Sequence, residues 1–438
     1  MNPRWWEPAH AVAESTSQST LLAIKIVVGL IALMVLAYLG GQRRVVKFQE
    51  RLGISGVITA GFPFVALGVI ARDPHIGILT PDVIKQLLPV LQFGLGWVGF
   101  IIGAQLDIRV LDRVPKGTAY LFLLEAMVPF CVTVAAVGGA MIWFATDDAV
   151  PMTWRDPALW RDLVLLGGAA AMTAPRKFRG FATRAWNENR SVDILLGQLD
   201  EIVGVIALLF ISAYFRVDTT GTWQLPDTAW LFVALGLGVA AGVVIFVPVR
   251  IPQSNAEFLA VVLGGIAFAS GIAAYLHLSP TVTCFLAGVL VTNFPNDQRA
   301  SVFKILRQLE RPVHLMFLIV AGAVWDVGDW HGWALAPVFV LARIAGKYAG
   351  VIASHTAVGE LLPAGFADRR ELVSPMSGLS ITLVISVTSL YVASGIKMDP
   401  GLVWIVTAVI GGSILNEVIV QLFPAKEAPV TPLPLPDA

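Results

Sequence analysis

Two adjacent carboxylates, Asp200 and Glu201, lie in a stretch of the chain that is otherwise almost entirely apolar. This stretch reads LLGQLDEIVGVIALLF and covers residues 195–210. A charge near the centre of a bilayer costs roughly 3 kcal/mol or more, so each acid in such a segment needs a partner or a function. The same reasoning applies to Lys347, which lies within the apolar run WALAPVFVLARIAGKYAGVIAS.

Asp200 and Glu201 lie roughly 12 Å from the start of their apolar segment at the helical rise of about 1.5 Å per residue. Lys347 lies at a similar distance from the end of its own segment, so the three charges are predicted to share one depth. One ammonium neutralises one carboxylate, which leaves a carboxylate that can hold either a proton or an alkali cation. This competition predicts cation–proton exchange. The alternative is a structural ion-pair cluster, which is a costly way to gain stability.

The composition indicates a polytopic membrane protein of the all-α class. Of 438 residues, 56% are hydrophobic and 14% are charged, and the mean hydropathy is +0.76. About 20 apolar residues span a bilayer as a helix, so the chain has room for about 13 transmembrane helices and for no sizeable soluble domain. The predicted spans begin near residues 21, 54, 87, 117, 160, 193, 229, 256, 280, 312, 333, 374 and 401. Residues 1–20 lack the features of a signal peptide, so the first run is kept as a span.

Positive charges collect in alternate connections between these runs, which predicts the orientation of the chain. The basic residues are Arg43, Arg44, Lys47, Arg51, Arg109, Arg113, Lys116, Arg176, Lys177, Arg179, Arg184, Arg190, Arg299, Lys304, Arg307, Arg311, Arg369 and Arg370. Cytoplasmic connections are enriched in Lys and Arg. We therefore expect the N-terminus outside and the C-terminus in the cytoplasm, in a bacterial inner membrane.

Thirteen spans divide into two six-helix repeats of inverted topology, joined by a seventh span. The expected parts are an external segment 1–20, a first repeat 21–215, a linking span 216–255, a second repeat 256–423 and a cytoplasmic tail 424–438. Breaking residues occur at corresponding places, at Thr173 and Pro175 in the fifth span and at Ser377 and Gly378 in the twelfth. Paired interruptions of this kind are typical of the broken helices that cross at substrate sites in transporters. An ordinary kink is the alternative.

Five stretches, in order along the chain, resemble motifs of the cation:proton antiporter superfamily, the sodium/proton exchangers with a thirteen-span, NapA-like arrangement. LDEIVGVIALL is similar to the paired-aspartate signature, and ARIAGKYAG is similar to the Gly-Lys-x-x-Gly stretch of the family. The other three stretches are FIIGAQLDIRVL, AAAMTAPR and LSPTVTCFLAGVL. The resemblance covers nearly the whole chain and implies a transporter that forms a homodimer.

The resemblance also implies roles for individual residues. Glu201 would bind the cation and the proton, Asp200 would pair with Lys347, and Thr173 would lie where the two broken helices cross. The chain departs from the family in having Glu in place of Asp at the second acid, which could change the choice of ion or exchange the roles of the pair. A second departure is Ala174 after Thr173, which removes one possible ligand. Arg176, Lys177 and Arg179, which follow the break, are a third departure that the sequence does not explain.

Two further charged residues are candidates for the buried cluster. Arg343 precedes Lys347 by four residues and therefore shares its helix face, where it could stabilise an acid. Glu125, in the fourth span, is a possible secondary site residue and a possible partner of Arg343. Its alternative role is to tie two helices together.

The sequence predicts a transporter rather than an enzyme. It contains no phosphate-binding loop, zinc-binding HExxH or exposed serine-nucleophile pattern. We expect no cofactor, no metal site beyond the transported alkali cation and no nucleic-acid partner. The expected substrates are H⁺ and either Na⁺ or K⁺, and the expected surroundings are the lipid bilayer. The alternatives are a channel-like cation efflux protein of the same fold and a non-transporting membrane sensor or scaffold.

Overall fold

The computed structural model describes residue 28 and residues 62–73, 79, 81–108, 118–146, 152–173, 192–216, 225–249, 254–294, 317–358 and 376–422. Within these ranges the regular structure is all helical, which confirms the expected all-α class. The one pairing of extended backbone in the described residues is an isolated antiparallel bridge between Thr173 and Met376.

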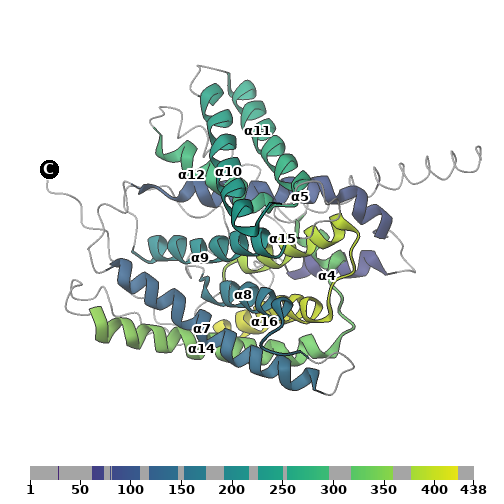
Figure 1. The fold of residues 1–438 in the computed structure, drawn as a ribbon, viewed down its shortest axis with the longest axis vertical. Helices are drawn as coiled ribbons and strands as arrows, with labels where there is room; N and C mark the ends of the chain where they lie inside the picture. Colours follow the sequence, from purple (N-terminus) through teal and green to yellow (C-terminus); the bar gives the residue numbers. More distant parts are fainter. Residues whose placement is uncertain are drawn as a thin grey trace, which may run out of the picture.

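The described helices follow the predicted apolar runs from the second to the thirteenth (Figure 1). They are α4 (Phe62–Arg72), α5 (Pro81–Gln105), α7 (Thr118–Ala145), α8 (Pro157–Ala171), α9 (Val192–Tyr214), α10 (Asp227–Val249), α11 (Asn255–Tyr275), α12 (Pro280–Asn293), α14 (Trp330–Val358), α15 (Leu379–Ser394) and α16 (Pro400–Leu422). Residues 317–324 are helical as well. The first predicted span lies outside the described residues apart from Val28, and so do the basic residues that predicted the orientation.

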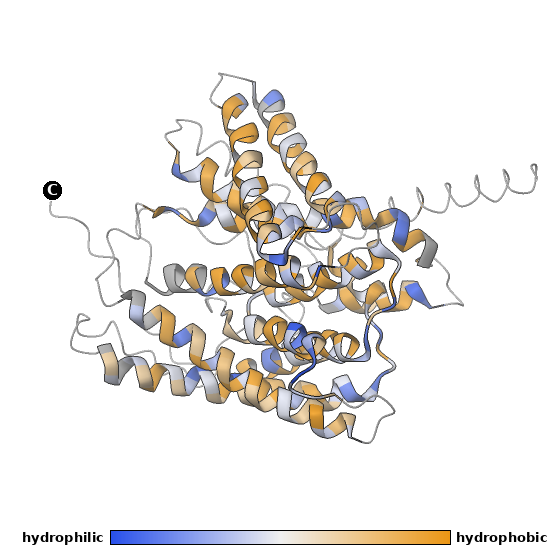
Figure 2. Cartoon of the chain, in the orientation of Figure 1, coloured by the Kyte–Doolittle hydropathy of each residue, from blue (hydrophilic) through white to orange (hydrophobic). Residues whose placement is uncertain are grey.

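Five helices in the described part of the chain are long and apolar enough to cross a membrane. They are Val83–Gln105, Phe122–Ala145, Asp227–Val249, Trp330–Ser354 and Pro400–Val420. Apolar residues dominate the helical surfaces, and strongly polar residues are few (Figure 2). The protein is therefore an integral membrane protein.

Two short helices, α8 and α15, end and begin near one another at the Thr173–Met376 bridge. α8 starts at Pro157, where Asp156 caps the helix by accepting a hydrogen bond from the backbone of Ala158 at 3.0 Å. It stops after Ala171, because Met172 adopts an extended backbone conformation. A helix of 15 or 16 residues is shorter than the bilayer core is thick. Each broken helix therefore accounts for only part of a crossing.

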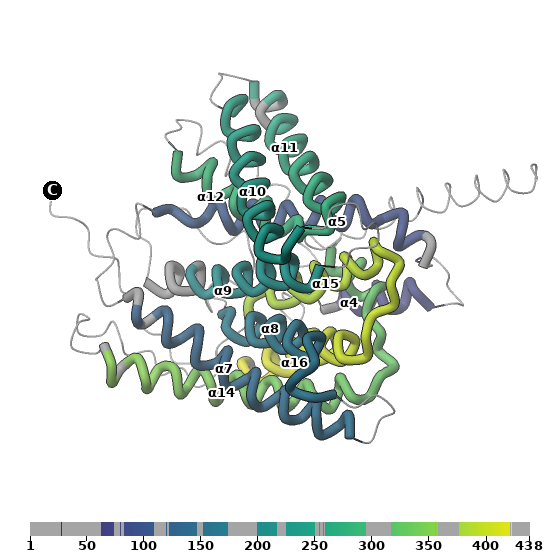
Figure 3. The backbone as a smooth tube through the Cα atoms, in the orientation of Figure 1, coloured from purple at the N-terminus to yellow at the C-terminus, as the bar shows by residue number. Residues whose placement is uncertain are grey.

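The helices pack as two groups (Figure 3). We call α7, α8, α9, α14, α15 and α16 the site-bearing group, and α5, α10, α11 and α12 the second group. In the second group α5 and α12 lie backbone against backbone, since a Cβ atom added at Gly103 would lie 1.9 Å from the carbonyl oxygen of Phe285. Contacts between the two groups run mainly through α9 and α15.

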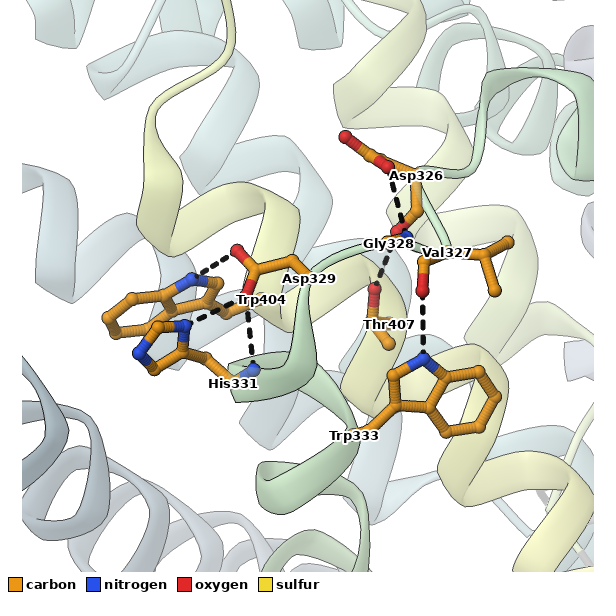
Figure 4. Close-up of polar contacts among 8 residues, drawn as sticks. All are labelled: Asp326, Val327, Gly328, Asp329, His331, Trp333, Trp404 and Thr407. Atoms are coloured by element: carbon orange, nitrogen blue, oxygen red, sulfur yellow. Dashed lines mark hydrogen bonds and ion pairs between the residues drawn. The ribbon is translucent and has the colours of Figure 1, made fainter.

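A polar and aromatic cluster fastens the start of α14 to α16 (Figure 4). Asp329 Oδ2 accepts a hydrogen bond from Trp404 Nε1 at 2.7 Å, and Asp329 Oδ1 lies 2.8 Å from His331 Nδ1. The rings of His331 and Trp404 stack with centroids 4.5 Å apart. Trp325 Nε1 donates to Thr407 Oγ1 at 3.0 Å. These contacts fix one end of α14 against α16, and so help to position Lys347 on the same helix.

The close approach of α5 and α12 predicts that Gly103 does not tolerate a larger side chain. Gly103→Ala places a methyl group against backbone that cannot move aside, and overpacking of this kind costs about 1–3 kcal/mol. We expect a lower temperature of thermal unfolding in detergent. Gly264→Ala on α11 is the matched control, because nothing lies within 4 Å of its added Cβ. Equal unfolding temperatures for the two variants would contradict the packing of α5 against α12.

Candidate cation and proton site

The two adjacent acids of α9 are buried and point toward different neighbours. Asp200 is 5% exposed and Glu201 is 0% exposed. Consecutive residues on a helix point about 100° apart, so one acid can face α14 while the other faces the broken helices. The two carboxylates therefore have separate environments, although they are neighbours in the chain.

Asp200 forms an ion pair with Lys347 of α14. Lys347 Nζ lies 3.0 Å from Asp200 Oδ2 and also donates to the backbone carbonyl of Glu125 at 3.1 Å. Lys347 is 8% exposed. The contact joins α9, α14 and α7, so the structure brings three of the predicted residues together.

Glu201 faces the start of α15. Its Oε1 accepts a hydrogen bond at 3.0 Å from the hydroxyl of Ser377, which is 3% exposed. Ser377 precedes Gly378, the N-cap of α15. The N-terminus of a helix carries a partial positive charge, so this location favours the ionised carboxylate. Ser377 and Gly378 thus lie immediately before α15, and Glu201 lies beside them.

Within the described residues, two further buried oxygen atoms of the candidate residues form no hydrogen bond. They are Thr173 Oγ1, on the residue that bridges to Met376, and Asp200 Oδ1, the carboxylate oxygen that does not contact Lys347. Alkali cations bind oxygen ligands with loose geometry. Carboxylate and hydroxyl oxygens, such as those of Glu201 and Ser377, are ligands of this type. Pro175, the other predicted break residue, lies outside the described residues.

Arg343 is fully buried on α14 and reaches the end of α8. Its guanidinium donates to the carbonyl oxygen of Met172 at 3.1 Å and to Asn416 Oδ1 at 3.3 Å. A cation is favourable at a helix C-terminus, where carbonyl groups lack partners. Arg343 also interacts electrostatically with Asp200. Sequence reasoning missed Asn416. Its signal in the sequence is an amide residue within the apolar run of the last predicted span.

Buried charges of both signs gather in this region. Within the described residues the acids are Asp200, Glu201, Glu125 and Glu417, and the bases are Lys347 and Arg343. All six are less than 10% exposed. Asp200 and Lys347 neutralise one another as an ion pair.

Buried acids and bases beside two short helices that meet at a backbone bridge are typical of one class of protein, the membrane transporters. The family model described as sodium/hydrogen exchanger, transmembrane, matches residues 32–421 of this chain. The chain therefore belongs to the sodium/hydrogen exchanger family, whose members are transporters and not enzymes.

A solved structure supports the same fold. The sodium proton antiporter MjNhaP1 from Methanocaldococcus jannaschii, determined at pH 8, is similar to this chain with a TM-score of 0.60 and 14% sequence identity. The similarity covers 94% of this chain and 100% of that chain. Among curated protein sequences, none matches.

The buried pair predicts that Lys347→Met destabilises the protein, because the charge of Asp200 stays buried without its counter-ion. Removing one partner of a buried pair costs about 3–5 kcal/mol. Adding Asp200→Asn should restore much of the stability, since it removes the stranded charge. Thermal unfolding in detergent measures both effects, and Lys397→Met, at an exposed position after α15, is the control. A double variant no more stable than Lys347→Met would contradict the pair.

Proposed function

We propose that this protein is a secondary antiporter that exchanges protons for a monovalent cation, Na⁺ or K⁺, at Glu201. The observation that carries the proposal is the fully buried carboxylate of Glu201, which accepts a hydrogen bond from Ser377 at the start of α15. A proton or a monovalent cation would neutralise this carboxylate. Both together would leave one positive charge in a low-dielectric interior, so the two substrates exclude each other.

The neighbouring residues have separate roles in this proposal. Ser377 Oγ and Thr173 Oγ1 would supply neutral oxygen ligands, and Asp200 would contribute its oxygen Oδ1. Lys347 would balance Asp200 while the cation is absent. A cation that draws Asp200 away from Lys347 would weaken the 3.0 Å ion pair, so the charge of Lys347 would respond to binding.

Arg343 and the broken helices would give the site its shape. Arg343 binds the end of α8 at Met172, and Ser380 of α15 donates to the carbonyl of Ala169 in α8 at 3.0 Å. These contacts keep the two short helices together. The site would therefore move as part of the site-bearing group when it is exposed first to one face of the membrane and then to the other.

The remaining predictions about topology belong to the same proposal. They are thirteen spans and two inverted repeats, over residues 21–215 and 256–423, joined by residues 216–255 and flanked by terminal segments 1–20 and 424–438. The antiparallel backbone bridge between Thr173 and Met376 is consistent with inverted repeats. We also propose that the protein is a homodimer in a bacterial inner membrane, with its N-terminus outside and its C-terminus in the cytoplasm. These features are supported by the family and by the charge pattern of the sequence.

Proton flux in sealed proteoliposomes with a trapped pH-sensitive dye tests the exchange. We expect Na⁺ or K⁺, added to the wild type, to trigger proton movement that falls to background in Glu201→Gln. Ca²⁺ should not drive the flux, because its two positive charges exceed the single negative charge of the Glu201 carboxylate. Glu257→Gln is the matched control, since Glu257 belongs to the capping box of α11, away from the cluster.

Other results would overturn parts of the proposal. A folded, inserted wild type that moves no protons with Na⁺, K⁺ or Li⁺ would rule out exchange. Cation movement that continues without proton movement would favour a channel-like protein. Full activity in Glu201→Gln would transfer the role of proton carrier to Asp200.

A further inference from the structure

The buried hydroxyl groups of α15 are numerous for a helix that has no exposed face. Leu379–Tyr391 are all buried. The buried hydroxyls in this range, leaving aside the phenol of Tyr391, are Ser380, Thr382, Ser386, Thr388 and Ser389. Thr382, Thr388 and Ser389 donate to backbone carbonyls of α15 or its cap, a common arrangement for hydroxyl residues in membrane helices. Ser380 and Ser386 reach other helices.

These two serines contact different groups of helices. Ser380 binds the carbonyl of Ala169 in α8, so its hydrogen bond stays within the site-bearing group. Ser386 Oγ lies 3.0 Å from the hydroxyl of Ser279, the N-cap of α12 in the second group. Ser386 is 0% exposed and Ser279 is 1% exposed. The Ser279–Ser386 hydrogen bond therefore crosses the boundary between the two groups.

This contact lies toward one face of the membrane. Arg161, near the start of α8, donates to the phenol of Tyr391, near the end of α15. Arg216, just after α9, donates to the carbonyl of Leu276, just after α11 and just before α12 begins. Because α8 and α9 are consecutive crossings, the start of α8 and the end of α9 share a face. The hydrogen bonds of Arg161 and Arg216 place the end of α15 and the start of α12 at this same face. In the proposed orientation it is the outer face.

A second hydroxyl of α12 lies deeper along the same boundary. Thr283 is 0% exposed, and its Oγ1 forms no hydrogen bond within the described residues. Residues four apart share a helix face, so Thr283 lies on the side of α12 that carries Ser279, whose hydroxyl contacts Ser386 of α15. By the same rule Thr382 lies on the side of α15 that carries Ser386. Since α12 and α15 run in opposite directions, both threonines lie between the serine contact and Ser377.

We propose that the outer route to Glu201 runs between α12 and α15 and that the Ser279–Ser386 hydrogen bond closes it. This inference rests on the proposed exchange function and names the residues through which that site would be reached. When the two groups separate on this side, the hydrogen bond breaks, and the hydroxyls of Ser279, Ser386, Thr283 and Thr382 face the gap. They would then replace part of the water around a monovalent cation on its way to Ser377 and Glu201.

A cysteine pair at the contact tests whether its opening is needed for exchange. In a chain carrying Cys131→Ala and Cys284→Ala, we would introduce Ser279→Cys and Ser386→Cys and oxidise the pair in proteoliposomes. We expect the loss of Na⁺- or K⁺-triggered proton flux to follow the crosslinked fraction, counted by thiol alkylation, and to be reversed by dithiothreitol. Each single cysteine variant should keep its flux under oxidant.

A crosslink within one group is the matched control. Ser270 Oγ of α11 lies 3.5 Å from Cys284 Sγ of α12, so Ser270→Cys with Cys131→Ala should form a disulfide that leaves exchange intact. Full flux in the crosslinked Ser279→Cys and Ser386→Cys protein would overturn the inference, and so would failure of that pair to crosslink. Absence of flux in the reduced proteins and the wild type would instead overturn the proposed function.

Labelling at Thr283 tests the route independently of flux. In the same chain without native cysteines, Thr283→Cys should react with a membrane-impermeant maleimide added to one face. Adding Ser279→Ala removes a hydrogen bond that favours the closed state. The labelling rate should then rise about fivefold, the factor expected for one typical neutral hydrogen bond. A residue that stays unlabelled in both variants, or is labelled equally in both, would overturn the route.

Discussion

The structure depends on the balance of charge around the Lys347–Asp200 ion pair. Charges in the bilayer interior are expensive, and attraction between them compensates only when the geometry is good. Here an ammonium lies 3.0 Å from a carboxylate, and its other contact is a backbone carbonyl. The pair neutralises one of the buried acids. In the proposed exchange, Glu201 is the carboxylate that takes up a proton or a cation.

Glu201 lies beside the point where the short helices α8 and α15 meet. Where α8 stops and α15 starts, backbone groups lose their partners within the helix, and lipid cannot supply replacements. Arg343 binds the carbonyl of Met172, the Thr173–Met376 bridge pairs extended backbone, and Ser377 binds both Glu201 and the backbone of Leu379. Ser377 therefore both satisfies a backbone group at the start of α15 and binds the acid.

The two groups of helices differ in how they are joined. Within the second group, α5 and α12 approach so closely at Gly103 that their backbones are in contact, and such packing resists motion. Across the boundary, apolar residues of both groups pack in one core cluster, and Ser279 and Ser386 share a hydrogen bond between neutral hydroxyls. A hydrogen bond of that kind is worth little net free energy. Breaking it would therefore add little to the cost of moving one group against the other.

The sequence by itself determined the class of the protein, the positions of its helices and the types of residue at the site. Apolar length, the cost of buried Asp200, Glu201 and Lys347, and the paired breaks are local properties of the chain. The tertiary structure decided which acid faces which partner and placed Arg343 on Met172 and Asn416. Those contacts join residues 73 or more positions apart, and they depend on how far each helix is rotated about its axis. No local pattern contains that rotation, because it is set by the packing of all neighbouring helices at once.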